Sequence, residues 1–206
     1  MELRRVSTVL VLLLAVAAAS PAWAKDYKSN TAAEGGYLWL FAYDQNAARI
    51  RVNPALCYGG TLFQIVDFSW SRNMMFELNY LYSFIQGEKL GWKGGNNVSF
   101  DMSWQEAAFN LGYMFEGRRM HPYLSGGLGA VFLDYADQTH KNLNDTEFTL
   151  NLGGGVDYTL WETGAAALER LDLGLRFRYY YSPLESVIMD VALNAVSITL
   201  RLNLRW

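Results

Sequence analysis

The chain has 206 residues, 17 of them lysine or arginine and 20 aspartate or glutamate, with a formal net charge of −3. The basic residues form no stripe along the sequence, which argues against nucleic acid as a partner. The length suits one domain, and the single cysteine, Cys57, excludes an intramolecular disulfide.

Residues 1–24 have the features of a secretory signal peptide. Arg4 and Arg5 give a basic start, residues 9–19 form an apolar run, and residues 22–24 read AWA, a small-residue cleavage site. The apolar run is too short for a membrane-spanning helix. We therefore expect an exported protein with a signal peptide over 1–24 and one domain over 25–206.

The rest of the chain alternates apolar and polar residues in eight segments. Each has roughly ten residues, the length that a tilted strand needs to cross a bilayer. The segments are 35–44, 58–69, 75–84, 98–115, 122–135, 147–160, 171–181 and 195–206. In the third segment, Phe76, Leu78 and Tyr80 fall on one face and Glu77 and Asn79 on the other, as a period of two requires. Eight β-strands are predicted.

The fourth segment and the connections add detail to this pattern. The apolar phase of 98–115 slips near residues 105–107, which predicts a β-bulge there. Short connections alternate with longer polar ones such as 45–57 and 85–97. Transmembrane barrels have the same asymmetry, with short periplasmic turns and longer outer loops. An even number of strands would place both termini in the periplasm.

Alternation alone also fits a soluble exported sandwich or a lipocalin-like barrel, whose apolar side chains point inward. Two features favour a membrane barrel. The polar face of the late segments carries full charges, while the other face is almost entirely aliphatic or aromatic. Aromatic residues also gather near segment ends, for example Tyr158 and Trp161, as in the aromatic girdles at the two membrane interfaces. We predict an all-β fold, an eight-stranded antiparallel up-and-down transmembrane β-barrel.

Three stretches, "HPYLSGGLGAVFLDY", "LDLGLRFRYYYS" and the terminal "LRLNLRW", resemble small bacterial outer-membrane β-barrels of the OmpA/OmpX/OmpW-like kind. The resemblance implies a place in the bacterial outer membrane, in contact with outer-membrane lipid and lipopolysaccharide. It also implies that the last strand carries the signal read by the outer-membrane assembly machinery, through Leu202, Leu204 and Trp206. Phenylalanine is the commoner last residue of that signal, so Trp206 departs from it.

A set of charged residues is predicted to point into the lumen: Glu77, Asp157, Asp172, Arg176, Arg178 and Arg201. Eight strands leave a lumen that side chains just fill. Charges there must pair, because an isolated ion out of water costs several kcal/mol. We expect a plug in which the three arginines face the three carboxylates. A narrow ion path lined by the same residues is the alternative.

Other chemistry finds less support in the sequence. The glycine runs at 125–129 and 153–155 lack the Lys-Ser/Thr ending of a phosphate-binding loop. Ser182 could be a nucleophile, but tyrosines precede it where barrel lipid A deacylases have a histidine. No cofactor and no metal site is predicted. We expect a non-enzymatic protein with a structural or surface-interaction role. The alternatives are a narrow pore for ions or small molecules and a lipid A-modifying enzyme.

Overall fold

The computed structural model describes residues 26–43, 49–67, 73–90, 97–137, 143–163, 168–186 and 191–206. The predicted signal peptide lies outside these residues. Within them the strands are β1 (Asp26–Tyr43), β2 (Arg49–Val52), β3 (Ala55–Asp67), β4 (Met74–Leu90), β5 (Val98–Met114), β6 (Met120–Asp137), β7 (Leu143–Glu162), β8 (Arg170–Ser186) and β9 (Val191–Arg205). No helix in this part of the chain is long and apolar enough to span a membrane.

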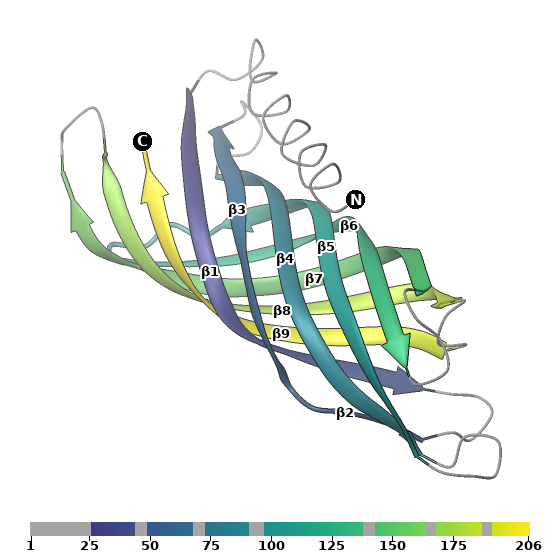
Figure 1. Cartoon of the computed structure of the whole chain (residues 1–206). Helices are drawn as coiled ribbons and strands as arrows, with labels where there is room; N and C mark the ends of the chain where they lie inside the picture. Colours follow the sequence, from purple (N-terminus) through teal and green to yellow (C-terminus); the bar gives the residue numbers. More distant parts are fainter. Residues whose placement is uncertain are drawn as a thin grey trace.

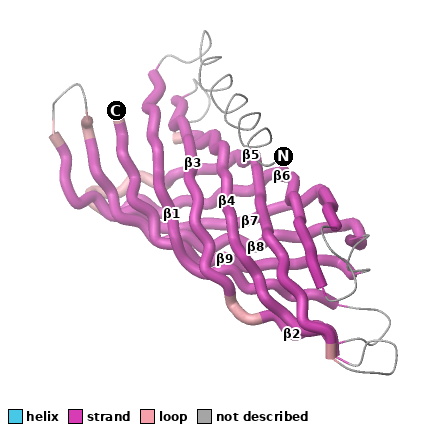
Figure 2. The backbone as a smooth tube through the Cα atoms, in the orientation of Figure 1, coloured by secondary structure: helices cyan, strands magenta, loops and turns pink. Residues whose placement is uncertain are grey.

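The long strands form a closed barrel (Figure 1 and Figure 2). Each pairs antiparallel with its neighbours in sequence, and β1 pairs with β9 to complete the ring. The prediction of an eight-stranded antiparallel up-and-down barrel is confirmed. The short β2 lies in a stretch predicted as a connection and pairs with β4 beyond the end of β3. Pro54 stands between β2 and β3, where its missing N–H cannot continue the ladder.

The strands are longer than the alternating segments predicted. β1 has 18 residues and begins at Asp26, nine residues before the predicted segment. Its first half is built from small and polar residues, so it carries no apolar period, yet it pairs continuously with β9 from Asn30 opposite Arg205. Strands of 17 to 20 residues span about 55–65 Å at 3.3 Å per residue. Tilted by about 35–45°, these strands rise about 40–50 Å along the barrel axis, roughly twice the 25 Å apolar band of an outer-membrane barrel. The barrel therefore projects beyond that band.

The polarity of the barrel wall inverts along its length, and β5 shows this most clearly. Its lumen-facing side chains are Phe100, Met102, Trp104, Glu106, Ala108 and Asn110, apolar at the start of the strand and polar later. Its outward-facing side chains are Asp101, Ser103, Gln105, Ala107, Phe109, Leu111 and Tyr113, in the opposite order. The strand therefore changes from polar outside and apolar inside to apolar outside and polar inside.

The predicted bulge near residues 105–107 is wrong. β5 pairs without a break with β4, from Lys89 opposite Val98 to Met74 opposite Tyr113, and also without a break with β6. The slip in apolar phase comes from the inversion of wall polarity, which changes which face is apolar without shifting the backbone. The register irregularities lie elsewhere, between Thr159 and Trp161 and between Tyr181 and Glu185.

Hydrogen bonds tie the outward polar side chains together in the half of the barrel next to the long connections. Gln86 donates to Asp101 across 3.0 Å, and Ser103 and Gln105 both donate to Asp134, across 3.1 and 3.3 Å. In the other half, the outward face carries exposed apolar side chains such as Phe109, Leu152 and Leu200. The apolar band therefore surrounds the half of the barrel that holds the short turns, the start of β1 and the end of β9.

Candidate functional site

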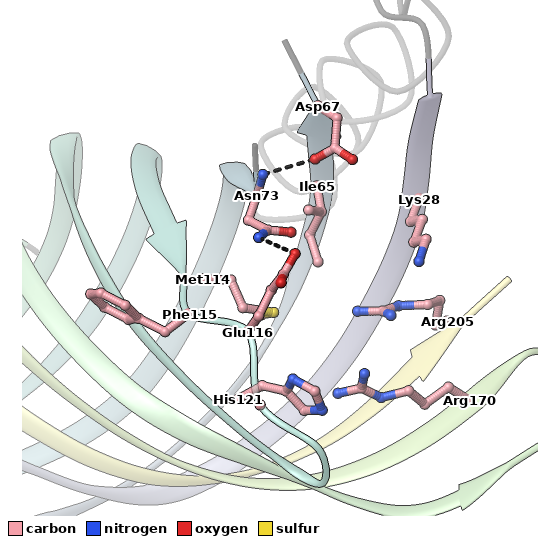
Figure 3. A pocket seen from close by; sticks show the side chains of 11 residues that line it. Lys28, Ile65, Asp67, Asn73, Met114, Phe115, Glu116, His121, Arg170 and Arg205 are labelled. Carbon is pink, nitrogen blue, oxygen red and sulfur yellow. Dashed lines mark hydrogen bonds between the residues drawn. The ribbon is translucent and has the colours of Figure 1, made fainter. Parts of the chain in front are cut away.

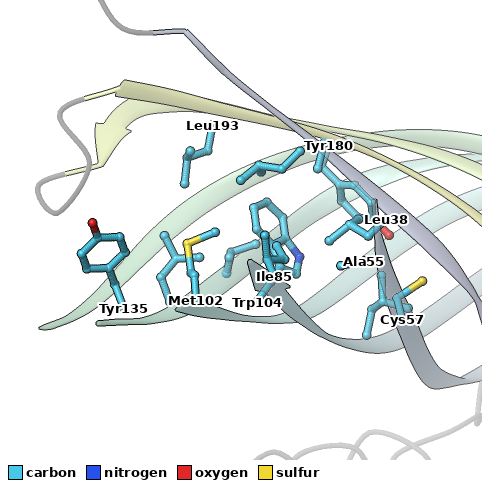
Figure 4. Packing of buried hydrophobic residues seen from close by; sticks show 14 of the residues in the cluster. Leu38, Ala55, Cys57, Ile85, Met102, Trp104, Tyr135, Tyr180 and Leu193 are labelled. Atoms are coloured by element: carbon cyan, nitrogen blue, oxygen red, sulfur yellow. The ribbon is translucent and has the colours of Figure 1, made fainter. Parts of the chain in front are cut away.

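We call the half of the barrel next to the long connections the projecting half. Its lumen is filled by a cluster of buried apolar side chains, which we call the outer cluster. Its members are Leu38, Leu40, Ala55, Cys57, Leu81, Ile85, Phe100, Met102, Trp104, Val131, Leu133, Tyr135, Tyr180, Leu193 and Ala195. Trp104, 1% exposed, meets Tyr180 edge-on, with ring centroids 6.1 Å apart. Tyr180 and Leu193 point across the lumen toward Trp104 and Met102 (Figure 4). The outer cluster leaves its central side chains no contact with water.

A network of arginines lies in the membrane half of the lumen, centred on Glu77. Glu77 is fully buried, and both of its carboxylate oxygens accept from arginines of β8 on the opposite wall. Arg176 bonds one oxygen, and Nη2 of Arg178 lies 3.1 Å from the other. Two arginines two residues apart on one strand point to the same side, which lets a single carboxylate hold both.

Glu34 is the second carboxylate of this network. Its Oε1 lies 3.1 Å from Nη1 of Arg176 and also accepts from Thr61 and Asn79, each across 2.9 Å. Thr199 donates to the other oxygen across 2.9 Å. Glu34 was not among the predicted lumen residues, because it precedes the first alternating segment. Continuing the period of two backward from Leu38 would have placed it on the lumen face.

All six predicted lumen residues face inward and are buried, but the structure does not bring them into one network. Asp157 accepts from Asn203 across 3.3 Å, and Asp172 pairs with Arg170, with Nε and Oδ1 2.5 Å apart. Neither carboxylate forms an ion pair with Arg176, Arg178 or Arg201 in the described part of the chain. The expected arrangement of three arginines against these three carboxylates is therefore not the one adopted.

Arg201 is held by aromatic groups in place of a carboxylate. Its Nη1 donates to Tyr123 Oη across 2.6 Å, and its guanidinium carbon lies 5.1 Å from the ring centroid of Phe63. The same Tyr123 hydroxyl accepts from Nε of Arg176 across 3.2 Å. A cation over an aromatic face is attracted by the ring quadrupole. Tyr123 thus connects Arg201 to the arginine network.

Gly155 leaves space for the Leu175 backbone and the Tyr123 ring, because a Cβ there would overlap the carbonyl oxygen of Leu175 and lie 2.5 Å from Oη of Tyr123. We expect Gly155→Val to displace the ring and lower the free energy of unfolding by about 1–3 kcal/mol, the usual cost of overpacking. Urea unfolding of the refolded barrel in detergent measures this. Gly35→Val is the matched control, since the atom nearest to its Cβ is 3.8 Å away. Equal losses of unfolding free energy in the two variants would show that the tight contacts around Gly155 do not matter to stability.

The end of the lumen next to the short turns opens into a cavity of about 290 Å³, which we call the mouth pocket (Figure 3). Lys28, Arg170 and Arg205 lie on one side of it, with His121 across from Arg170. Asp67 and Glu116 lie on the other side. No group of three or more histidine, cysteine or carboxylate side chains among the described residues could hold a metal ion.

The other sequence-predicted residues have simple placements. Leu202, Leu204 and Trp206 are exposed on the outer face of the barrel, and the Trp206 amide donates to the carbonyl of Ser29 across 3.2 Å. Ser182 is buried on the lumen side.

Comparisons with known proteins agree with this architecture. A family model described as "Outer membrane protein beta-barrel domain" matches residues 9–205. A search of curated proteins found no match.

Several solved structures are similar to this chain at low identity. Neisserial surface protein A (NspA) is 12% identical, with 88% of this chain and 100% of that chain covered and a TM-score of 0.54. The N-terminal β-barrel domain of Pseudomonas aeruginosa OprF is 14% identical over the same shares, with a TM-score of 0.47. Ail of Yersinia pestis, in complex with the heparin analogue sucrose octasulfate, is 10% identical, with 88% and 99% covered and a TM-score of 0.49. The chain belongs to the outer membrane protein β-barrel domain family and is a small β-barrel of the bacterial outer membrane.

Proposed function

We propose that this barrel is sealed and non-enzymatic, and that it serves the envelope as a structural element and through its projecting outer half. The outer cluster carries the proposal, because it fills the lumen with apolar side chains where the wall leaves the apolar band. An ion crossing this layer would exchange its hydration for mostly apolar side chains, which costs several kcal/mol or more. The arginine network beneath it then stabilises the barrel and does not line a path.

The orientation that supports this role places both termini in the periplasm. The short turns, the start of β1 and the end of β9 share one end of the barrel, and the strands extend at the other. Short turns are periplasmic in barrels of this class. The outward polar row of Gln86, Asp101 and Asp134 would then stand above the outer leaflet, where the sugars and phosphates of lipopolysaccharide are its expected neighbours.

The proposed role also requires export and assembly of the chain. We infer that residues 1–24 are removed as a signal peptide and that 25–206 form the mature barrel. Leu202, Leu204 and Trp206 present an apolar outer face on β9, which suits the signal for the outer-membrane assembly machinery. Deleting Trp206 and following insertion into outer-membrane vesicles tests this role.

A lipid A-modifying activity would need a nucleophile open to lipid. Ser182 is only 1% exposed and faces the lumen, which supports the non-enzymatic role. Expression of the protein should therefore leave the mass of lipid A unchanged, with Ser182→Ala as the paired sample. A mass shift that Ser182→Ala abolishes would replace this proposal with an enzyme.

Single-channel recording of the refolded mature chain in a planar bilayer tests the seal. We expect no discrete openings, since the outer cluster leaves no hydrated route. Folding of the same sample is checked by its altered gel mobility before and after boiling. Reproducible current steps from folded protein would contradict the proposal and favour a narrow pore lined by Arg176, Arg178 and Arg201.

A further inference from the structure

The mouth pocket contains two buried arginines that no function described above uses. Arg170 and Arg205 are 6% and 8% exposed and line the cavity side by side. They stand directly opposite each other on the adjacent strands β8 and β9. Like charges in that position repel and destabilise a sheet, and Asp172 supplies one carboxylate for the two guanidinium charges. A further anion beside the two arginines would therefore be stabilised.

Each arginine is fixed from behind by one partner. Arg170 pairs through Nε with Asp172, and Arg205 donates through Nε to Oδ1 of Asn30 across 3.1 Å. These contacts hold both guanidinium groups at the wall of the cavity (Figure 3). Nη2 of Arg170 is buried with no hydrogen-bond partner among the described residues, and a buried unpaired donor costs about 1–3 kcal/mol. Lys28 adds a third positive charge to the same side.

The opposite side of the mouth pocket is acidic. Asn73 holds both carboxylates there, because its backbone amide donates to Asp67 across 2.8 Å and its side-chain amide donates to Glu116 across 3.0 Å. Asn73 itself has a φ of 59°, the left-handed conformation that asparagine tolerates. A ligand that fits this cavity would carry a negative group for the arginines and a positive group for the carboxylates.

We propose that the mouth pocket binds a small zwitterionic phosphate of the phosphoethanolamine class. Guanidinium groups bind phosphate through paired N–H···O bonds. Asp172 offsets the charge of Arg170, so Lys28 and Arg205 balance Asp67 and Glu116, and this lining suits a zwitterion. Two guanidinium groups side by side suit a phosphate, which has three acceptor oxygens, better than a carboxylate, which has two. A cavity of about 290 Å³ holds a ligand of this size, since a water molecule occupies about 30 Å³. The ligand could arrive free in solution or as the head group of a phospholipid.

Calorimetric titration of the refolded barrel in neutral detergent tests the proposal. The probes are phosphoethanolamine, inorganic phosphate, ethanolamine and a short-chain phosphatidylethanolamine with two six-carbon tails. We expect phosphoethanolamine to bind at least tenfold more tightly than phosphate or ethanolamine. Equal or tighter binding of the short-chain lipid identifies a head group as the ligand, and weaker binding of it identifies the free compound.

Variants separate the two sides of the mouth pocket. Arg170→Gln and Arg205→Gln should each weaken phosphoethanolamine binding at least tenfold, and two variants guard against one of them failing to fold. Glu116→Gln should remove the preference over inorganic phosphate, because it weakens only the site for the ammonium group. Arg118→Gln, an exposed arginine in the neighbouring turn outside the pocket lining, should bind like the unchanged protein.

Three results would overturn the proposal. They are no binding of phosphoethanolamine by folded protein, equal losses in Arg118→Gln and Arg205→Gln, and an unchanged preference in Glu116→Gln. None of these results bears on whether the barrel conducts ions. The binding experiments therefore test the mouth pocket, and the conductance experiment tests the sealed lumen.

Discussion

Replacing Glu77 by glutamine should lower the free energy of unfolding by about 3–5 kcal/mol, the cost of removing one partner from a buried ion pair. Glu77 is fully buried and holds both Arg176 and Arg178. The glutamine fills the same volume, so the loss comes from leaving two buried guanidinium groups with one fewer negative charge. Urea titration of the refolded barrel in detergent, followed by tryptophan fluorescence, measures the change.

Two comparisons make the Glu77 result specific. Glu116→Gln, on an exposed turn residue, should change stability by less than 0.5 kcal/mol, as surface substitutions usually do. The double variant Glu77→Gln with Arg178→Gln should lose less than the sum of the single variants, because each removes the partner of the other. A loss below about 1 kcal/mol in Glu77→Gln, or additive losses in the pair, would show that the arginine network does not stabilise the barrel.

Replacing Trp104 by alanine should cost about 3–5 kcal/mol through the cavity left in the outer cluster. Trp104 is among the largest fully buried side chains and packs against Tyr180 from the opposite wall. We expect the projecting half to lose packing, so that protease cuts the strands near the long connections at lower urea than in the unchanged protein. Limited proteolysis in detergent with increasing urea locates the effect along the chain.

Phe109 supplies the matched control for Trp104. It lies on the same strand and faces outward, 43% exposed. Phe109→Ala removes an aromatic ring from the outer surface, leaves no internal cavity and should cost far less. If both variants lose the same stability, or if cleavage in Trp104→Ala falls at the short turns, the outer cluster is not the core of the projecting half.

The period of two was enough to predict the barrel and the faces of its strands. The alternation of Glu77 with Phe76 and Leu78 indicates a strand with different surroundings on its two sides. Neighbouring residues alone are enough to recognise it. The lengths of the strands were harder to predict. The start of β1, for example, consists mostly of small and polar residues, which show no apolar period. Where the wall polarity inverts, near residues 105–107, the same reasoning predicted a bulge in place of a change of environment.

The partners of the lumen charges could not be predicted from the sequence. Arg176 meets Glu34 and Glu77, which are 142 and 99 residues away in the chain. Facing inward is a property of each strand, but meeting across the lumen depends on the level of each residue along the barrel. That level follows from the register of every strand in between. A shift of two residues in one pairing would keep Arg176 inside and give it other partners.

The pairing of β1 with β9 also sets the order of events in folding. Asn30 lies opposite Arg205 at this joint, so its contacts have nearly the greatest sequence separation that the chain permits. Contacts of this kind form slowly, because a long loop must close before they contribute. Until β9 arrives, β1 and β8 each present an unpaired edge that can add a strand from another chain. An incomplete barrel is therefore open to aggregation until β9 pairs with β1.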